Sequence, residues 1–178
     1  DVVSTSLGWY NLEPVDGTGE FEAIVQDARS NGITWCTAAG NDRQAHWGGA
    51  FRDTNGDTFH EYGTQDINYY GPGNGSAYII PAGYNIRAFL KWDDWTSVTE
   101  DYDLRVWVYS GGWQWLALSS NPQNGGAGQT PTEMISITAP ITAPYGFTIE
   151  RYSGTRNVNL ELFCPKVARL DEIVHARS

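Results

Sequence analysis

The fold is decided by residues 86–118, which read IRAFLKWDDWTSVTEDYDLRVWVYSGGWQWLAL. Within this stretch, every second residue is apolar at Ile86, Ala88, Leu90 and Trp92, and again at Leu104, Val106 and Val108. A period of two places these side chains on one face of a β-strand. The Gly111-Gly112 pair then predicts a hairpin turn into a further strand over 113–118.

More strands are expected on the C-terminal side of this stretch, over 133–138, 145–152 and 158–164. Clusters of Gly, Pro, Asn and Ser separate them, as expected for the turns of an all-β protein. We therefore expect a mainly β chain, with an antiparallel β-sandwich or jelly roll over about residues 46–164.

Residues 1–45 follow a different pattern. An apolar helical stripe consists of Phe21, Ile24, Val25 and Ala28. Thr18 is the expected N-cap of this helix, and Gly32 is its expected stop. Buried strands are expected on either side, over 2–8 and 33–39, and the strand–helix–strand order makes them parallel. Since two strands cannot form a stable sheet alone, this partial α/β unit is expected to belong to something larger.

The composition excludes several classes of function. The chain has 178 residues, and its 11 Lys and Arg against 21 Asp and Glu give a net charge of −10. This charge argues against a nucleic-acid partner and against anionic membranes. The sequence has no apolar run long enough to span a bilayer. With 40% hydrophobic and 13% aromatic residues, the chain can bury a core and is not expected to be disordered.

Two short segments of the N-terminal unit resemble subtilisin-like serine peptidases. They are Thr5-Ser6-Leu7-Gly8 and Ala38-Ala39-Gly40-Asn41. The resemblance implies substrate-binding roles for Ser6, Leu7, Gly8, Ala38, Ala39 and Gly40. It also implies that Asn41 is the oxyanion-hole residue, donating its side-chain amide to the charge that develops in the transition state.

The catalytic motifs of that family are missing from this sequence. There is no Gly-Thr-Ser or Asp-Thr-Gly segment, and none of His46, His60 and His175 is followed by Gly-Thr. A triad works only as a set, so we expect the chain to be inactive alone. The resemblance therefore implies a non-catalytic fragment of a secreted subtilisin-like serine endopeptidase, whose intact form acts on a polypeptide substrate.

The central part of the chain resembles a second family, the bacterial pre-peptidase C-terminal type of β-sandwich. The resemblance is carried by Phe89–Asp94, Tyr102–Val106, Glu133–Ser136 and Tyr152–Gly154. It implies an inserted sandwich over 46–165, followed by a tail over 166–178 that leads back into the peptidase. Such modules occur on secreted proteases, so the resemblance implies an extracellular protein in which the sandwich aids calcium-assisted stability or substrate binding.

Two acidic segments are candidate calcium sites. In the first, oxygen-bearing side chains occupy positions 1, 3, 5 and 9 of a loop, as Asp53, Asn55, Asp57 and Glu61. Calcium prefers several such hard oxygen ligands, but the same pattern is typical of an Asx-rich turn. The second segment consists of Asp93, Asp94, Glu100, Asp101 and Asp103. For this segment a solvated loop is favoured over a cation site.

Tryptophans supply a candidate binding surface. Trp107 is the better surface candidate because it alternates with apolar neighbours, whereas Trp113 and Trp115 are expected to share a face with Ala117. In a sandwich most aromatic side chains belong to the core. If these three are exposed, the alternative function is a stand-alone module that binds carbohydrate or protein, such as a polysaccharide or a matrix protein.

The two cysteines leave an alternative open. Cys36 is expected on a buried strand, and Cys164 shares a face with apolar residues. They could form a disulfide or stay as two separate thiols, and free thiols are slightly favoured.

Overall fold

The computed structural model describes residues 1–14, 16–38, 40, 42–165 and 169–173, which form one helix and ten strands. The chain divides into two compact units, Asp1–Asn41 and Asp42–Ser178, which are described separately. Within the described ranges, no helix is long and apolar enough to cross a membrane.

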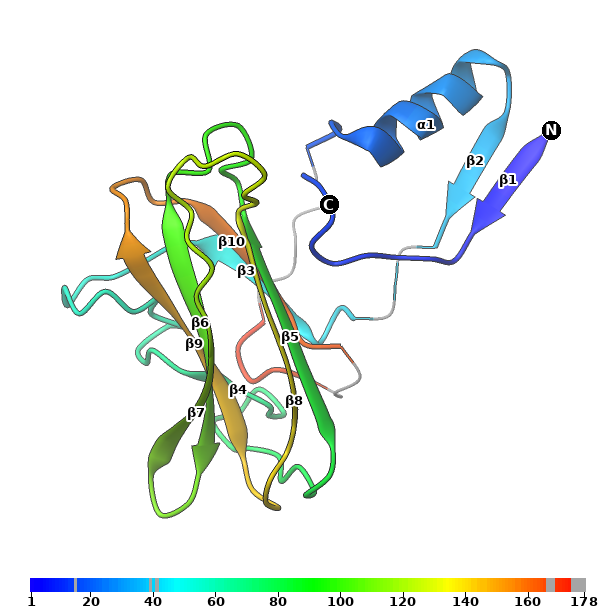
Figure 1. Ribbon diagram of the computed structural model, residues 1–178. Coiled ribbons are helices and arrows are strands. Elements are labelled where there is room, and N and C mark those ends of the chain that lie inside the picture. The colour runs from blue at the N-terminus through cyan, green and yellow to red at the C-terminus, as the bar shows by residue number, and fades with distance from the viewer. Residues whose placement is uncertain (15, 39, 41, 166–168, 174–178) are drawn as a thin grey trace. The chain divides into compact units, whose positions relative to one another are not determined.

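The first unit is a parallel strand–helix–strand motif, as the sequence predicted. It consists of β1 (Val2–Thr5), α1 (Glu20–Ser30) and β2 (Thr34–Thr37), and Val2 pairs with Thr34 (Figure 1). Gly32 adopts a φ of 74° just beyond the helix and confirms the expected stop.

The expected N-cap at Thr18 is wrong. Helix α1 is preceded by Gly19 and has no side-chain hydrogen bond from its N-cap residue. The Thr18 hydroxyl instead donates to Asp16 at 2.6 Å. The N–H of Phe21, in the first turn of the helix, donates instead to the carboxylate of Glu13 at 3.1 Å, a residue farther back in the sequence.

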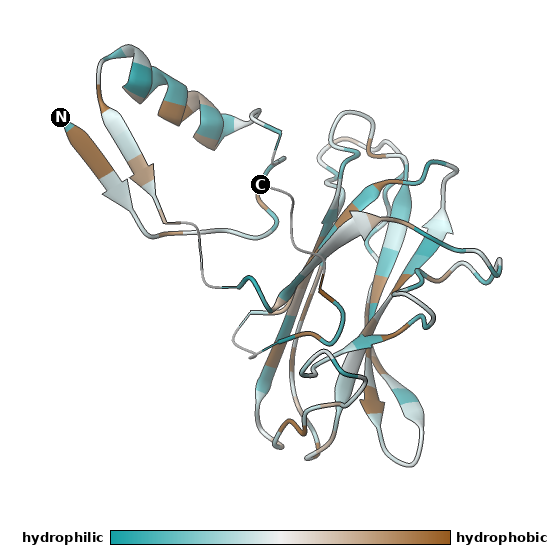
Figure 2. Cartoon of the chain, turned by 180° about the vertical axis from the view of Figure 1, so that it is seen from behind, coloured by the Kyte–Doolittle hydropathy of each residue, from teal (hydrophilic) through white to brown (hydrophobic). Residues whose placement is uncertain are grey.

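The strands of this unit are not buried, contrary to the sequence-based prediction. Val2 is 70% exposed, and among the described residues of the unit only Ala28 is a buried hydrophobic residue. Figure 2 shows the hydrophobic start of β1 beside the N-terminus. The physical reason is that one helix covers only one face of a sheet, and both strands here are also edge strands.

The second unit is a sandwich of two antiparallel four-stranded sheets (Figure 1). One sheet has the order β3-β10-β5-β8, and its strands are His46–Ala50, Asn159–Phe163, Asn85–Trp92 and Thr132–Thr138. The other has the order β4-β9-β6-β7, and its strands are Asn68–Tyr69, Tyr145–Ser153, Asp101–Tyr109 and Trp113–Ser119. Eight strands interleaved in this way form a jelly roll. The expected fold class is confirmed.

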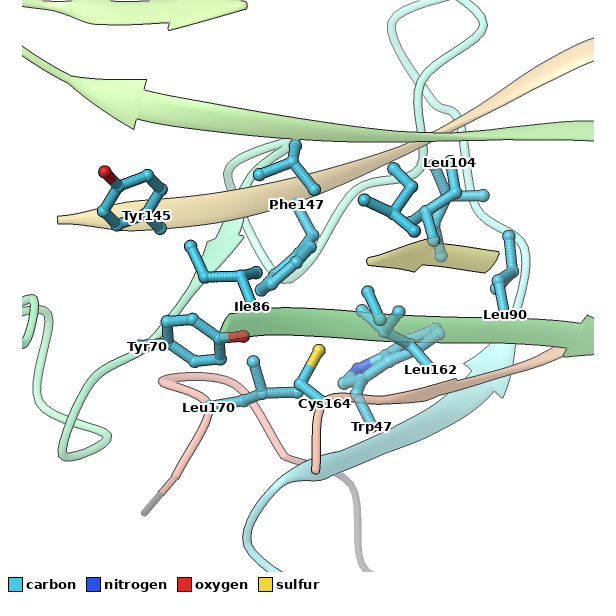
Figure 3. Close-up of a cluster of buried hydrophobic side chains, with 14 of the residues drawn as sticks. Trp47, Tyr70, Ile86, Leu90, Leu104, Tyr145, Phe147, Leu162, Cys164 and Leu170 are labelled. Carbon is cyan, nitrogen blue, oxygen red and sulfur yellow. The ribbon is translucent and has the colours of Figure 1, made fainter. Parts of the chain in front are cut away.

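The core of the sandwich lies between the two sheets. The inner face of β5 contributes Ile86, Ala88, Leu90 and Trp92, and that of β6 contributes Leu104, Val106 and Val108, as the alternation predicted. Figure 3 shows Phe147 and Leu104 from one sheet facing Ile86 and Leu162 from the other. Interdigitation of two apolar faces is what stabilises a sandwich.

Both cysteines are free thiols in the structure. Cys164 is buried in the sandwich core beside Tyr70 (Figure 3). Cys36 lies on the exposed strand β2, so its expected place on a buried strand is wrong.

Candidate functional site

The residues expected to line a substrate cleft come from one edge of the first unit. Thr5 pairs with Thr37 at the ends of β1 and β2, and the N–H of Ala38 donates to the carbonyl of Thr5 at 3.0 Å. The segments that follow therefore leave from the same carboxyl edge of a parallel pair, where α/β sheets bind ligands. The exposed residues on these segments are Ser6, Leu7, Gly8, Ala38 and Gly40. Ala39 and Asn41 lie outside the described residues.

The described histidines are structural groups. The Nδ1 atom of His60 accepts the N–H of Arg52 at 3.0 Å, and its Nε2 is buried. Burial lowers the pKa of His60 to about 4, so its imidazole is neutral at physiological pH. His46 stacks on Phe163 with ring centroids 4.2 Å apart, and burial lowers its pKa as well. His175 lies outside the described residues.

The loop with the calcium candidates is closed by its own hydrogen bonds. The two carboxylate oxygens of Asp53 accept the N–H groups of Gly56 at 2.7 Å and Thr58 at 3.1 Å. The remaining candidates are engaged in the same way: Asn55 accepts the N–H of Asp57, Asp57 accepts that of Phe59, and Glu61 accepts that of Thr54. These contacts match the Asx-rich turn that was the alternative.

The carboxylates of this loop are not gathered around one point. Among the described residues, no group of three or more His, Cys, Asp or Glu could hold a metal ion. Calcium at Asp53, Asn55, Asp57 and Glu61 stays a prediction.

The second acidic segment is not a solvated loop, so that expectation is wrong. Of its five carboxylates, Asp94, Glu100, Asp101 and Asp103 are buried. Asp94 accepts the N–H of Thr99 at 2.6 Å and of Glu100 at 2.9 Å, and pairs with Arg156 at 3.3 Å. These contacts replace water for the carboxylate and fix the turn between β5 and β6.

Asp103 belongs to a group of carboxylates that come from β6, β8 and β9. Burial, with further contributions from Asp101, Glu133 and Glu150, raises the pKa of Asp103 to about 6, although Arg105 opposes the shift. Glu133 is buried by segment 119–123, where Asn121 donates its N–H at 2.7 Å. Sequence reasoning missed this role of Glu133, because the contact joins two segments that no local pattern connects.

The three candidate tryptophans meet on one face of the sandwich. Trp107 pairs with Trp115, and Tyr109 pairs with Trp113, on the face of β6 opposite the core. Trp115 is 61% exposed and Tyr109 46%, whereas Trp107 and Trp113 are half-buried. The expectation that Ala117 shares this face is wrong, because the pairing shifts by one residue between Val106 and Trp107.

Comparison with known proteins supports a fold class but no family. No family model matches the chain, and no curated protein matches it. The chain is mainly β, with antiparallel sheets and one short helix among its described residues. A solved structure similar to it is that of the Clostridium perfringens CspB protease, with a TM-score of 0.54 and 14% sequence identity. The similarity covers 97% of this chain but only 37% of that one, and at this identity it concerns the fold alone.

Proposed function

We propose that this chain is a non-catalytic part of a subtilisin-like serine peptidase of the extracellular space. The first unit shapes one side of a substrate cleft, and the sandwich serves stability or substrate binding. One observation carries the proposal. Ser6 and Ala38 follow adjacent parallel strands at the edge where the resemblance expects substrate, in a chain whose fold is similar to that of a protease.

The exposed apolar surface of the first unit supports this interpretation. Its side chains that remain exposed include Val2, Leu7, Trp9, Leu12 and Ile24. A parallel sheet is normally covered on both faces and continues with further strands. We infer that the remainder of a peptidase fold covers these side chains and pairs with the free edges of β1 and β2.

The chemistry of the proposal is limited to transition-state binding. An amide donor such as Asn41 contributes by hydrogen bonding to a developing oxyanion, which is worth about 3–4 kcal/mol in subtilisin, the known example of this effect. It cannot attack a carbonyl. Because this sequence has no Gly-Thr-Ser or His-Gly-Thr motif, the nucleophile and the base of the proposed peptidase must come from residues other than these 178.

Labelling with a serine-directed fluorophosphonate tests the proposal. We expect no labelling of the purified chain and no casein hydrolysis, with active subtilisin labelled in parallel as a positive control. A chain that is labelled at a serine, or that cleaves casein at a rate proportional to its concentration, overturns the proposal.

Amide hydrogen exchange supplies a second, independent readout. Because the first unit lacks a buried core, we expect its β1 and β2 amides to exchange at least about a hundredfold faster than those of β5 and β10. Equal protection in the two units would show that the first unit is complete by itself and would contradict the proposal.

A further inference from the structure

The outer face of β6 and β7 carries an aromatic surface, defined here as Trp107, Tyr109, Trp113 and Trp115. A β-bulge creates it. Val106, on the core side, pairs with Ala117, and regular pairing would next place Trp107 opposite Leu116 and Val108 opposite Trp115. The bulge instead pairs Trp107 with Trp115, so one extra residue moves Trp115 from the core face to the outer face.

The same bulge places Trp113 on the outer face, opposite Tyr109. Bulges are common next to functional sites, where they re-aim side chains. Here the bulge keeps a large apolar side chain in solvent, since Trp115 is 61% exposed. Folding alone gives no reason for that exposure, because burying an indole is favourable.

Neighbouring contacts hold three of the four side chains of the aromatic surface in place, those of Trp107, Tyr109 and Trp113. The indole N–H of Trp107 donates to the hydroxyl of Thr148 at 2.9 Å. Trp113 stacks on Tyr69 with centroids 6.0 Å apart and meets the edge of Tyr109 at 5.5 Å. A surface held in this way loses little conformational entropy when a ligand binds.

The lack of charge in the segment that carries the aromatic surface restricts the class of ligand. No charged residue occurs between Arg105 and Glu133, although charged residues make up 18% of the whole chain. Exposed aromatics with neighbours such as Gln114 and Ser110 thus form a neutral strip on an acidic protein. The segment itself therefore offers no ion pair to a ligand, and the charged side chains near its Trp113 end are acidic, since Asp171 and Glu172 lie close to Tyr69.

The size of the aromatic surface also restricts the ligand. A typical protein interface takes about 20–30 residues on each side, whereas this surface consists of two cross-strand pairs, Trp107 with Trp115 and Tyr109 with Trp113. A patch of four rings suits a small number of flat rings of a ligand that lies on the sheet.

We propose that the aromatic surface binds a neutral polysaccharide. The C–H groups on one face of a sugar ring are weakly positive, and they pack against the electron-rich face of an indole. Trp115 supplies the exposed ring, Tyr109 extends the surface, and Trp107 and Trp113 fix its position.

Retention on insoluble cellulose and chitin, together with affinity electrophoresis in laminarin and starch, tests the proposal on the full chain. We expect binding to at least one of these four neutral glycans, accompanied by a change in tryptophan fluorescence. Trp115→Ala should weaken it about tenfold or more. Trp9→Ala is the matched control, since Trp9 is 56% exposed in the other unit, and it should leave the affinity unchanged.

Three outcomes overturn the proposal: no binding to any of the four glycans, binding that Trp115→Ala leaves unchanged, and binding that Trp9→Ala weakens equally. Binding to immobilised gelatin that is lost in Trp115→Ala, without glycan binding, assigns the surface to a protein partner and also overturns it. Because both variants lie outside any catalytic motif, these results are independent of the fluorophosphonate test.

Discussion

The two units of the molecule differ in how much of their apolar surface they bury. The sandwich has two apolar sheet faces that cover each other, and its continuous core, which includes Phe147 and Leu162, consists only of residues of this second unit. The first unit has one helix and two strands, and buries only Ala28 among its described hydrophobic residues. The difference teaches that good local patterns suffice to form elements, whereas stability requires a second layer.

The largest expected effect on the free energy of unfolding comes from removing a core side chain of the sandwich. Phe147 is fully buried and packs edge to face against Tyr70, with the two ring centroids 5.2 Å apart. We expect Phe147→Ala to lower the free energy of unfolding by about 3–5 kcal/mol, measured by urea denaturation. The matched truncation Val2→Ala, in the exposed first unit, should change it by less than about 0.5 kcal/mol. A larger loss from Val2→Ala would mean that the first unit unfolds together with the sandwich.

A smaller effect is expected from Asp103, because a buried carboxylate weakens the sandwich at neutral pH. Its pKa is about 6 in the folded chain and near 3.8 in the unfolded chain. Below pH 3.8 both states are protonated and nothing is lost; as the pH rises through 6, stability falls. Asp103→Asn should therefore stabilise the chain by about 1–3 kcal/mol at pH 8 and by little at pH 4.

The measurement for Asp103 is the difference in unfolding free energy between variant and parent at the two pH values. His60 acts in the opposite direction, because its pKa is lowered to about 4 and its stabilisation, present above pH 6.5, is lost as the pH falls. That contribution is common to both proteins and cancels in the difference. An equal gain at both pH values would show that the charge of Asp103 is not the cause.

The same comparison explains what the sequence could predict. The period-two strands of the sandwich were predicted correctly because their pattern records which face is buried. In contrast, β3 was missed as a strand because Gly48 and Gly49 interrupt any such pattern, and β4 is only two residues long. The first unit was predicted with the right elements and the wrong burial, because burial depends on surfaces that a local pattern does not contain.

The candidate sites were harder to predict for a related reason. The three candidate tryptophans share a face only because of one extra residue in β7, and a bulge leaves no signal in WQWLAL. The raised pKa of Asp103 depends in part on Glu133, which follows about thirty residues later in the chain. Such contacts between distant segments are set by topology, which local spacing does not encode.

Calcium should produce the smallest effect, because the loop of Asp53 is already closed by its own hydrogen bonds. Extracellular modules bind calcium with a Kd of about 10⁻⁴–10⁻³ M. A site of that strength would add about 0.4–1.4 kcal/mol at 1 mM calcium and raise Tm by a few degrees. The measurement is Tm by circular dichroism in calcium and in EGTA.

Two variants decide whether a rise in Tm comes from this loop. Asp57→Asn should abolish it, since a carboxylate ligand becomes a weaker amide, while Asp16→Asn, an exposed acidic residue of the first unit, should leave it intact. An identical Tm in calcium and EGTA would reject a structural site. A rise in Tm that persists in Asp57→Asn would show that the ion binds elsewhere in the chain. The first result would leave the sandwich stabilised by its two apolar faces without a bound ion, which sharpens its contrast with the first unit.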